Sequence, residues 1–412
     1  MSKTLIIGAG HGGVQLAASL RKHGYEGQIT LVSDEPDFPY HKPPLSKSFM
    51  QSPEEALQPL RAEAFYEAHR ISLMLGRQAV GIDSQRKLVS FNDGEGETYD
   101  SLVLATGTRA RQLTCPGHDL DGVFSIRTAM DARNLREQIS DPKDVVIIGG
   151  GFIGLEGAAM LAKLGHRVTV LEVGPRLLGR AVCSEAAEAV ASELKELGVH
   201  VRNGVGVDCL KGEDGKVCSV VTSEGDELRA HLVIVGIGAI PQTALAEKAG
   251  LEIENGIKVD GNMCSSEASI FAIGDCVSYP QAHLQTRFRL ESVQNAVEQA
   301  DHLALFLTNQ TTVPYSRLPW FWSDIGSLKM QIAGMAVGET KRFPVKRDGK
   351  LASVYHFQED KLVCVETINS SGEHMLARKM ISTGFSPKAD LEILSDLPNL
   401  KQSFLKSIQR QE

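Results

Sequence analysis

The sequence lacks the features that mark several large protein classes. Its seven cysteines are odd in number, scattered, and without any Cys-x-x-Cys motif, so we expect neither a disulfide framework nor a metal site. No apolar run reaches the roughly 18 to 20 uninterrupted residues that a membrane-spanning helix needs. A strand-like segment begins at Lys3, which leaves no room for a secretory signal. These absences predict a soluble, cytoplasmic protein.

The sequence also has fewer basic than acidic residues. The chain has 43 Lys and Arg residues against 51 Asp and Glu residues, a net charge of -8. Nucleic acids and anionic membranes recruit proteins through surplus Lys and Arg, so neither is an expected partner. The 412 residues, 42% of them hydrophobic, are enough for two or three globular domains.

The glycines that are present follow a strand-turn-helix-strand pattern at the N-terminus. We expect a strand over 4–7, a glycine turn over 8–13, a helix over 14–23 and a strand over 28–33. The turn Gly8-Ala-Gly10-His-Gly12-Gly13 has glycines where a dinucleotide-binding turn needs them, for tightness, pyrophosphate approach and helix packing. Asp34 or Glu35 then supplies a carboxylate for ribose hydroxyls.

The same pattern recurs in the middle of the chain. A strand is expected over 144–148, a turn with Gly149, Gly151 and Gly154, a helix over 155–164 and a strand over 166–172. Glu172 would hydrogen-bond a free ribose hydroxyl and repel a 2'-phosphate, which favours NADH over NADPH. Arg176 and Arg180 are close enough in sequence to weaken that preference.

Two further segments, 99–107 and 231–238, each resemble the last strand of a sheet, and a similar strand over 269–274 precedes Asp275. After Tyr315 the sequence becomes rich in β-type stretches, with a helix expected over 374–382. The predicted fold is α/β, with two Rossmann-like dinucleotide-binding domains and a C-terminal α+β domain. The expected boundaries are 1–112 with 243–315 for the first domain, 113–242 for the second and 316–412 for the third.

With these motifs, the chain resembles the FAD-dependent, NADH-linked ferredoxin reductases of oxygenase systems, within the glutathione-reductase-like flavoprotein class. The resemblance covers essentially the whole chain. It rests on the motifs Pro43-Pro-Leu-Ser-Lys47, Ala105-Thr-Gly107, Arg127-Thr128, Gly149 to Glu156, Gly274-Asp275, Glu291-Ser-Val293 and Pro319-Trp-Phe-Trp-Ser-Asp324.

The resemblance implies a set of site residues. Lys47 would lie beside the flavin and hold negative charge on it, with Glu156 on the nicotinamide side and Trp322 as an aromatic wall. The implied FAD-binding residues are Gly8, Gly10, Gly12, Gly13, Asp34, Lys47, Ala79, Ala105, Thr106, Gly107, Arg127, Asp275 and Val293. The implied NAD-binding residues are Gly149, Gly151, Gly154, Glu156, Glu172 and Gly238.

Each of these side chains also has an ordinary structural interpretation. Without the resemblance, Lys47 is an exposed loop residue, Glu156 a helix-dipole partner and Asp275 a helix N-cap. Arg127 could be a surface cation and Trp322 part of a core. Relatives often have Gln where this chain has Ile325, which puts one polar flavin contact in doubt, and the reactivity of Cys276 is open.

The positions of the cysteines bear on which reactions this flavoprotein architecture could catalyse here. No Cys lies in the loop that ends at Lys47, which argues against disulfide and peroxide reductases. The resemblance implies hydride transfer from NADH to FAD and then single-electron transfer to an acidic, transiently bound [2Fe-2S] ferredoxin that feeds a haem-thiolate monooxygenase or a ring-hydroxylating dioxygenase. Candidate docking cations are Arg287, Arg289, Arg317 and Lys329.

Three alternatives stay open: a rubredoxin reductase, a quinone reductase, and a redox-sensing interaction protein resembling apoptosis-inducing factor. The chain could be a monomer or a homodimer.

Overall fold

The computed structural model describes residues 2–52, 54–281 and 286–409. The chain forms two compact units, each assembled from segments that are distant in sequence. The first unit comprises residues 1–44, 56–109 and 239–317, and the second comprises residues 45–55, 110–238 and 318–412. The predicted second and third domains therefore fall in one unit, together with the short segment after the Pro-Pro pair. The three-domain division stays a prediction.

The first unit is built around a five-stranded parallel sheet with the strand order β19-β7-β1-β2-β3. These strands are β1 (Lys3–Ile7), β2 (Gln28–Val32), β3 (Ile71–Met74), β7 (Ser101–Leu104) and β19 (Ile270–Ala272). The apolar side chains of β1, β2, β7 and β19 are almost fully buried, as expected for a parallel sheet covered on both faces, whereas Leu73 and Met74 of the edge strand β3 are partly buried. Helices α1 (His11–Lys22) and α8 (Val293–Leu307) pack against each other.

The predicted strand-turn-helix-strand unit is present here, with small shifts at its ends. Helix α1 begins at His11, because Gly10 already occupies the N-cap position. The segment 99–107 was expected to form the last strand of its sheet, and this expectation is wrong. Strand β7 lies inside the sheet, because β19 from much later in the chain pairs with its other edge.

Smaller elements complete the first unit. An antiparallel ribbon has the order β4-β5-β6, a second small sheet has the order β18-β20-β21, and β17 pairs with β8. Their bounds are α3 (Glu63–Ala68), β4 (Ala79–Asp83), β5 (Leu88–Phe91), β6 (Gly96–Thr98), β8 (Thr108–Ala110), β17 (Ala239–Pro241), α7 (Ala244–Lys248), β18 (Ile257–Lys258), η2 (Gly274–Cys276), β20 (Val277–Gln281) and β21 (Thr286–Phe288). The 3-10 turn η1 (Pro43–Ser46) bridges the sequence boundary between the two units.

The second unit contains the other parallel sheet, with the order β12-β11-β10-β16-β9. Strand β16 is flanked by β10 and β9, and it is the last strand of this sheet in chain order, as expected for the segment 231–238. An antiparallel ribbon, β13-β14-β15, accompanies this sheet. The bounds are α2 (Ser48–Gln51), β9 (Val123–Phe124), α4 (Ala129–Gln138), β10 (Asp144–Ile148), α5 (Phe152–Lys163), β11 (Arg167–Glu172), α6 (Ser184–Glu196), β12 (His200–Asn203), β13 (Val207–Glu213), β14 (Lys216–Thr222), β15 (Glu227–Arg229) and β16 (Leu232–Val235).

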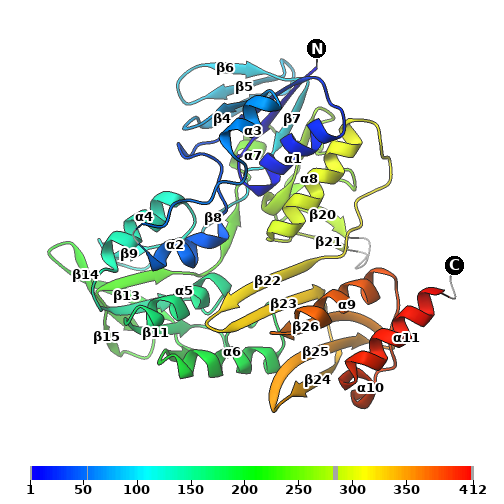
Figure 1. Ribbon diagram of the computed structural model, residues 1–412. Helices are drawn as coiled ribbons and strands as arrows, with labels where there is room; N and C mark the ends of the chain where they lie inside the picture. The colour runs from blue at the N-terminus through cyan, green and yellow to red at the C-terminus, as the bar shows by residue number, and fades with distance from the viewer. Residues whose placement is uncertain (1, 53, 282–285, 410–412) are drawn as a thin grey trace. The chain divides into compact units, whose positions relative to one another are not determined.

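The C-terminal part of the second unit is a five-stranded antiparallel sheet with the order β22-β23-β26-β25-β24 (Figure 1). Side chains of β25 and β26 alternate between its two faces. One face buries Tyr355, Phe357 and Val365 against the C-terminal helices, while α6 packs on β25 and α5 on β22. The bounds are β22 (Trp320–Ile325), β23 (Leu328–Gly334), β24 (Lys341–Arg347), β25 (Lys350–Gln358), β26 (Lys361–Ile368), α9 (Ser371–Ser382), α10 (Leu391–Ser395) and α11 (Leu397–Gln409).

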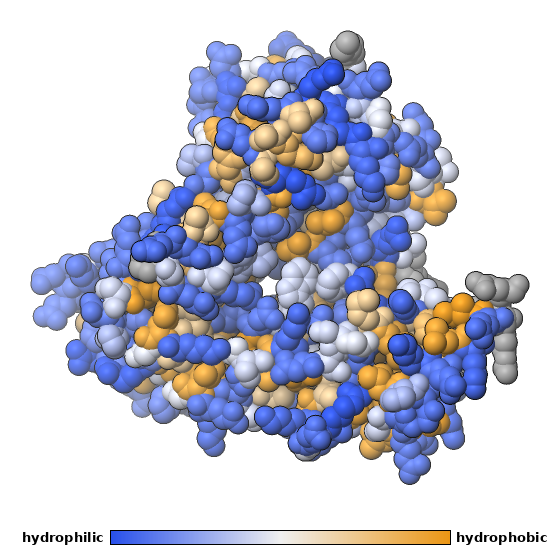
Figure 2. All heavy atoms as spheres, in the orientation of Figure 1, coloured by the Kyte–Doolittle hydropathy of each residue, from blue (hydrophilic) through white to orange (hydrophobic). Residues whose placement is uncertain are grey.

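Among the residues that the structure describes, no helix is both long enough and apolar enough to cross a lipid bilayer. The surface turned to the viewer is mainly hydrophilic, with hydrophobic side chains in small groups (Figure 2). Such scattered exposure is ordinary for a protein surface.

Candidate functional site

The first glycine turn, in the first unit, leaves open space where a dinucleotide would approach. Gly8 has a φ of 113°, and a Cβ atom there would lie 2.2 Å from the backbone oxygen of Ala105. A Cβ on Gly13 would lie 1.9 Å from the oxygen of Gly8. A Cβ on Gly10, by contrast, would meet nothing within 4 Å. Two glycines thus allow close backbone packing, and the third borders room for a phosphate.

The second glycine turn repeats this arrangement in the second unit. Gly149 has a φ of 108°, and a Cβ there would lie 2.4 Å from the oxygen of Gly236. A Cβ on Gly154 would lie 2.5 Å from the oxygen of Gly149, whereas one on Gly151 would meet only a single atom, at 3.8 Å. In the described structure no side chain caps the start of α1 or α5, so their first N–H groups can serve a pyrophosphate.

Glu172 lies at the end of β11, beside this second turn. Its Oε2 accepts a hydrogen bond from the backbone N–H of Gly150, and its Oε1 accepts one from Gly174, both at 2.6 Å. Each carboxylate oxygen has a second lone pair, so both can still accept from a ribose hydroxyl. The guanidinium of Arg176 donates to backbone carbonyls, including that of Gly179 at 3.1 Å, whereas Arg180 stays exposed.

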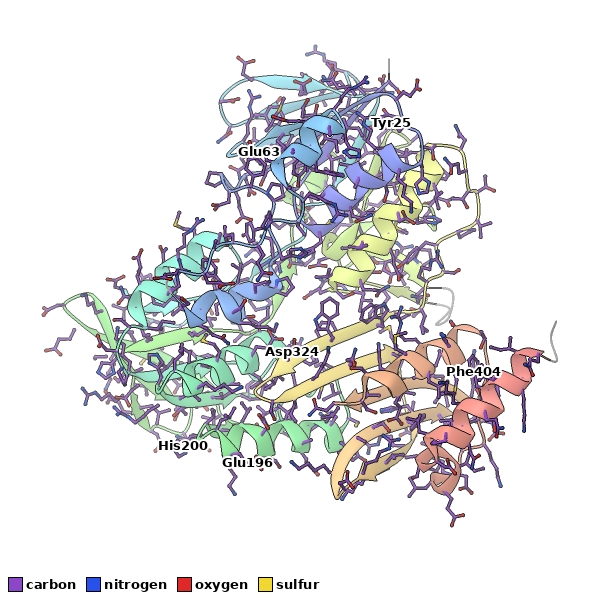
Figure 3. The ribbon with its side chains drawn as sticks, viewed as in Figure 1. Tyr25, Glu63, Glu196, His200, Asp324 and Phe404 are labelled. Atoms are coloured by element: carbon purple, nitrogen blue, oxygen red, sulfur yellow. The ribbon has the colours of Figure 1, made fainter. Side chains whose placement is uncertain are left out.

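Glu156 is the centre of a hydrogen-bonded cluster in the second unit. It lies on α5 and is only 8% exposed. Its Oε2 accepts from Lys47 Nζ at 2.7 Å and from Ser46 Oγ at 2.9 Å. Its Oε1 accepts from Ser323 Oγ at 2.6 Å and from the backbone N–H of Asp324, labelled in Figure 3, at 3.4 Å. The two residues assigned to the redox site by resemblance are thus direct partners, and both serines were missed.

The two tryptophans lie together on β22, as their spacing suggests. Their ring centroids are 5.5 Å apart, and Trp320 also contacts the His374 ring at 5.6 Å. The guanidinium carbon of Arg378 lies 4.2 Å from the Trp320 ring centroid, in cation-π geometry. Trp322 is half-buried, and its role as an aromatic wall stays a prediction. Ile325 is fully buried, so it is a core residue of the sheet.

Several predicted cofactor residues come together in the first unit. Thr106 Oγ1 donates to the backbone oxygen of Gln242 at 2.8 Å, and the Gln242 N–H donates to Gly107 O at 2.9 Å. These bonds join the Ala105-Thr-Gly107 turn to the returning chain. Asp275 lies inside η2, whose N-cap is Ile273, so the N-cap interpretation of Asp275 is wrong. Val293 is the first residue of α8.

Other assignments are less constrained. Asp34 is exposed, whereas the adjacent Glu35 accepts from Tyr40 Oη at 2.5 Å and Lys42 Nζ at 2.7 Å. Ala79 starts β4 in the first unit, and Arg127 lies in the second unit, just before α4. Their roles toward a cofactor stay predictions.

The structure also shows the surroundings of the Cys276 thiol and of the four candidate docking cations. Cys276 is fully buried, and burial raises the pKa of its thiol, which favours an inert residue. Arg287 donates to backbone carbonyls, including that of Val259 at 2.8 Å, and Arg289 pairs with Glu291 at 2.5 Å. Both arginines are therefore occupied within the first unit. Two of the four candidate docking cations remain exposed: Arg317 and Lys329.

Two paired features define the class of protein. In each of two parallel sheets a strand ends in a glycine turn built for a dinucleotide, and the helix after the second turn carries the almost fully buried Glu156, which pairs with the partly exposed Lys47. This is the arrangement of a flavoprotein oxidoreductase that takes electrons from a nicotinamide cofactor.

The comparisons with known proteins agree. Residues 2–300 match the pyridine nucleotide-disulphide oxidoreductase family, and residues 320–401 match the reductase C-terminal family. The chain is 42% identical over 381 residues to rhodocoxin reductase from Rhodococcus erythropolis, covering 92% of this chain and 89% of that protein. It is 41% identical over 368 residues to rubredoxin-NAD(+) reductase from Pseudomonas putida, covering 89% and 95%.

A solved structure is similarly close. The structure of the ferredoxin reductase for the CYP199A2 system from Rhodopseudomonas palustris has a TM-score of 0.94 and 36% sequence identity to this chain. The match covers 98% of this chain and 100% of that one. The chain belongs to the pyridine nucleotide-disulphide oxidoreductase family. It is an FAD-dependent, NAD(H)-linked oxidoreductase that passes electrons to a redox protein.

Proposed function

We propose that this protein is an NADH-dependent reductase of a [2Fe-2S] ferredoxin, and that the ferredoxin supplies an oxygenase. The observation that carries the proposal is the redox site itself. In the described residues near Lys47 and Glu156 no cysteine contributes to the cluster, so the chain offers no thiol relay there. With no disulfide intermediate at this cluster, the flavin would pass its electrons directly to an acceptor, which we take to be a separate electron-carrier protein.

Both glycine turns fit the cofactors that the family uses. When bound, FAD accepts a hydride from NADH and releases the electrons singly. We assign FAD to the turn at Gly10 in the first unit and NADH to the turn at Gly151 in the second. The uncapped starts of α1 and α5 would donate N–H groups to each pyrophosphate.

The residues of the cluster have distinct tasks in this proposal. Lys47 Nζ supplies a fixed positive charge toward the flavin, by the logic that places cations where negative charge develops. Glu156 holds that ammonium in place through its Oε2. Ser46 and Ser323 each donate to Glu156, which fixes the carboxylate in one orientation. Trp322 would border the flavin as an aromatic side chain.

The choice of ferredoxin is supported by the full-length match to a ferredoxin reductase of a CYP199A2 system, and an acidic carrier would suit the exposed Arg317 and Lys329. Rubredoxin is the second candidate, because the relative from Pseudomonas putida named for that carrier is 41% identical. A quinone reductase and a redox-sensing interaction protein have no comparable observation in their favour. We place the protein in the cytoplasm, where NADH is available.

An acceptor panel tests this proposal. The purified holoenzyme would be assayed for cytochrome c reduction by NADH with no carrier, with a [2Fe-2S] ferredoxin, or with a rubredoxin. We expect the ferredoxin to raise the rate by at least tenfold and the rubredoxin to give a smaller rise. A larger rise with rubredoxin would replace the ferredoxin assignment, and a rate that no carrier raises would contradict both.

A further inference from the structure

A buried cluster of metal-ligand side chains lies in the second unit, apart from the cofactor residues discussed above. Cys183, His356 and Glu366 are between 2% and 6% exposed, and their ligand atoms all lie within 4.8 Å of one another. Cys183 Sγ is 3.0 Å from Glu366 Oε2, and His356 Nε2 is 3.3 Å from Glu366 Oε1. A thiol, an imidazole and a carboxylate are thus close enough to share one ion.

The fold explains why three distant residues meet. Glu366 and Cys364 are two residues apart on β26 and therefore share one face of the sheet. His356 pairs with Cys364 across β25 and β26, so it is on that same face. Cys183 is the N-cap residue of α6, and α6 packs on β25. Glu366 also accepts from the backbone N–H of Cys183 at 3.0 Å, which ties α6 to the sheet.

His356 provides an independent indication of a ligand. Its Nδ1 contacts Thr340 Oγ1 at 3.2 Å, which leaves Nε2 directed at the cluster. Within the part of the chain that the structure describes, this buried Nε2 has no hydrogen-bond partner, because its approach to Glu366 lacks hydrogen-bond geometry. Buried polar atoms are rarely left in this condition, so an orphaned imidazole nitrogen calls for an explanation.

The charges of the cluster also favour a cation. Once a metal ion has displaced the Cys183 thiol proton, Cys183 and Glu366 carry two negative charges, and neutral His356 carries none. A divalent ion would balance them inside a region where unpaired charge is costly. In a tetrahedral zinc site, bonds of about 2.0 to 2.3 Å put ligand atoms roughly 3.3 to 3.8 Å apart. The separations of 3.0 and 3.3 Å from Glu366 to Cys183 and to His356 need only small adjustments to match, and the separation of Cys183 Sγ from the His356 ring nitrogen is at most 4.8 Å.

We propose that Cys183, His356 and Glu366 form a buried Zn²⁺ site that fastens α6 to the C-terminal sheet. Sulfur, imidazole and carboxylate ligands together suit Zn²⁺ better than Mg²⁺ or Ca²⁺, which prefer oxygen alone. Binding forms bonds from zinc to Cys183 Sγ, His356 Nε2 and a Glu366 oxygen and keeps one water of the ion as the fourth ligand. It releases the other waters and the Cys183 thiol proton to solvent, with no change in oxidation state. The role is structural and does not depend on the proposed electron acceptor. It departs from the expectation of no metal site, which rested on motif spacing.

The competing interpretation is that Glu366 only caps α6 and that the thiol is an ordinary buried hydrogen-bond donor. A metal titration of the full-length, reduced holoprotein separates the two. The protein would be stripped with a chelator and then titrated with Co²⁺, whose d–d bands appear to the red of flavin absorption when coordination is tetrahedral. Zn²⁺ would then be added to displace the Co²⁺. The variants are Cys183→Ser and His356→Gln, with Cys218→Ser as the matched control because Cys218 is exposed.

We expect one equivalent of Co²⁺ to give tetrahedral bands in the wild type and in Cys218→Ser, with displacement by Zn²⁺. Both cluster variants should bind at least tenfold more weakly. Wild-type protein without tetrahedral bands, or cluster variants that bind as well as the wild type, would overturn the proposal. Flavin content and circular dichroism would identify a variant that misfolds. If a variant misfolds, X-ray absorption spectroscopy of the zinc-loaded wild type tests the site instead. The proposal requires one sulfur ligand to zinc, and a spectrum without a sulfur ligand would contradict it.

Discussion

The Nζ atom of Lys47 lies 2.7 Å from Oε2 of Glu156, in a site where the carboxylate is almost fully buried and the lysine side chain is 25% exposed. The pair joins the short segment after Pro44 to the helix that follows the second glycine turn. Because an ammonium and a carboxylate at this distance fix each other, substituting either one removes the partner that holds the other in position.

We predict that Lys47→Met slows flavin reduction by NADH about tenfold to a hundredfold, since one positive charge toward the reacting centre is lost. Glu156→Gln should slow it too, because the carboxamide holds Lys47 less firmly. Anaerobic stopped-flow absorbance of the flavin measures both. Lys211→Met is the matched control, because Lys211 makes an exposed ion pair with Glu227 at 2.6 Å in the antiparallel ribbon β13-β14-β15. Equal rates for Lys47→Met and this control would contradict the assigned role.

Ser323→Ala should have a smaller effect than Glu156→Gln. Its Oγ donates at 2.6 Å to the Glu156 oxygen that does not face Lys47, so the substitution loosens the carboxylate without removing it. We expect a severalfold slower flavin reduction, with recovery in Ser323→Thr, which keeps the hydroxyl. The same stopped-flow assay applies. A slow Ser323→Thr variant would indicate a packing effect instead of a hydrogen bond.

Glu172→Ala should shift cofactor preference toward NADPH. The variant removes the carboxylate that can accept from a ribose hydroxyl and would repel a 2'-phosphate, while the exposed Arg180 remains nearby. We expect the ratio of kcat/KM for NADH over NADPH to fall by at least tenfold. Steady-state kinetics with both cofactors measure this ratio. If it stays unchanged while the flavin content is normal, Glu172 serves only the turn around Gly150.

Stability should depend on pH through His374. This residue is 1% exposed, and burial, followed by the charge of Arg378, lowers its pKa from 6.5 to about 4. Between those values the unfolded chain binds a proton that the folded chain does not, so the free energy of unfolding falls as pH drops from 6.5 to 4. The loss should total roughly 3 kcal/mol, from about 1.4 kcal/mol per pH unit.

Denaturant unfolding at several pH values measures this dependence, and His374→Gln should remove the share that His374 contributes. A variant whose stability falls with pH as steeply as that of the wild type would show that other groups cause the decline.

The C-terminal sheet should depend strongly on Arg347. Glu373 is completely buried, and it accepts from Arg347, Ser353 and Tyr355 at 2.6 to 2.7 Å. In Arg347→Met the carboxylate loses the one cationic partner that it has among the described residues, which should cost about 3 to 5 kcal/mol. Arg342→Met is the matched control, since Arg342 is 40% exposed and pairs with Glu185, and should cost less than about 1 kcal/mol. Similar unfolding midpoints for the two variants would refute this ranking.

Local sequence patterns predicted the elements around both glycine turns well. Parallel strands such as β1 and β10 are short apolar runs, and glycines mark the turns that follow them, so each signal lies within a few residues. The order of the strands was harder to predict from the sequence, because β7 pairs with β19, which lies more than 150 residues later in the chain. Such pairing depends on tertiary structure, and no local periodicity encodes it.

The candidate site was predictable only in part, for the same reason. Lys47, Glu156 and Trp322 were identified through resemblance to a family, not through spacing. Ser46 and Ser323 lie next to identified residues, yet their hydrogen bonds to Glu156 span 110 and 167 residues of sequence. The cluster of Cys183, His356 and Glu366 could not be predicted from the sequence, because these residues come from three separate segments and form no metal-ligand motif.

The most direct test of the central claim is a sequential anaerobic experiment on the wild-type holoenzyme. The enzyme is mixed with one equivalent of NADH, and oxidised [2Fe-2S] ferredoxin is then added while flavin and iron-sulfur absorbance are followed. We predict rapid bleaching of the flavin by NADH, and then reduction of two equivalents of ferredoxin, because a hydride carries two electrons and the carrier accepts one. Bleaching without any ferredoxin reduction, or no bleaching at all, would contradict it.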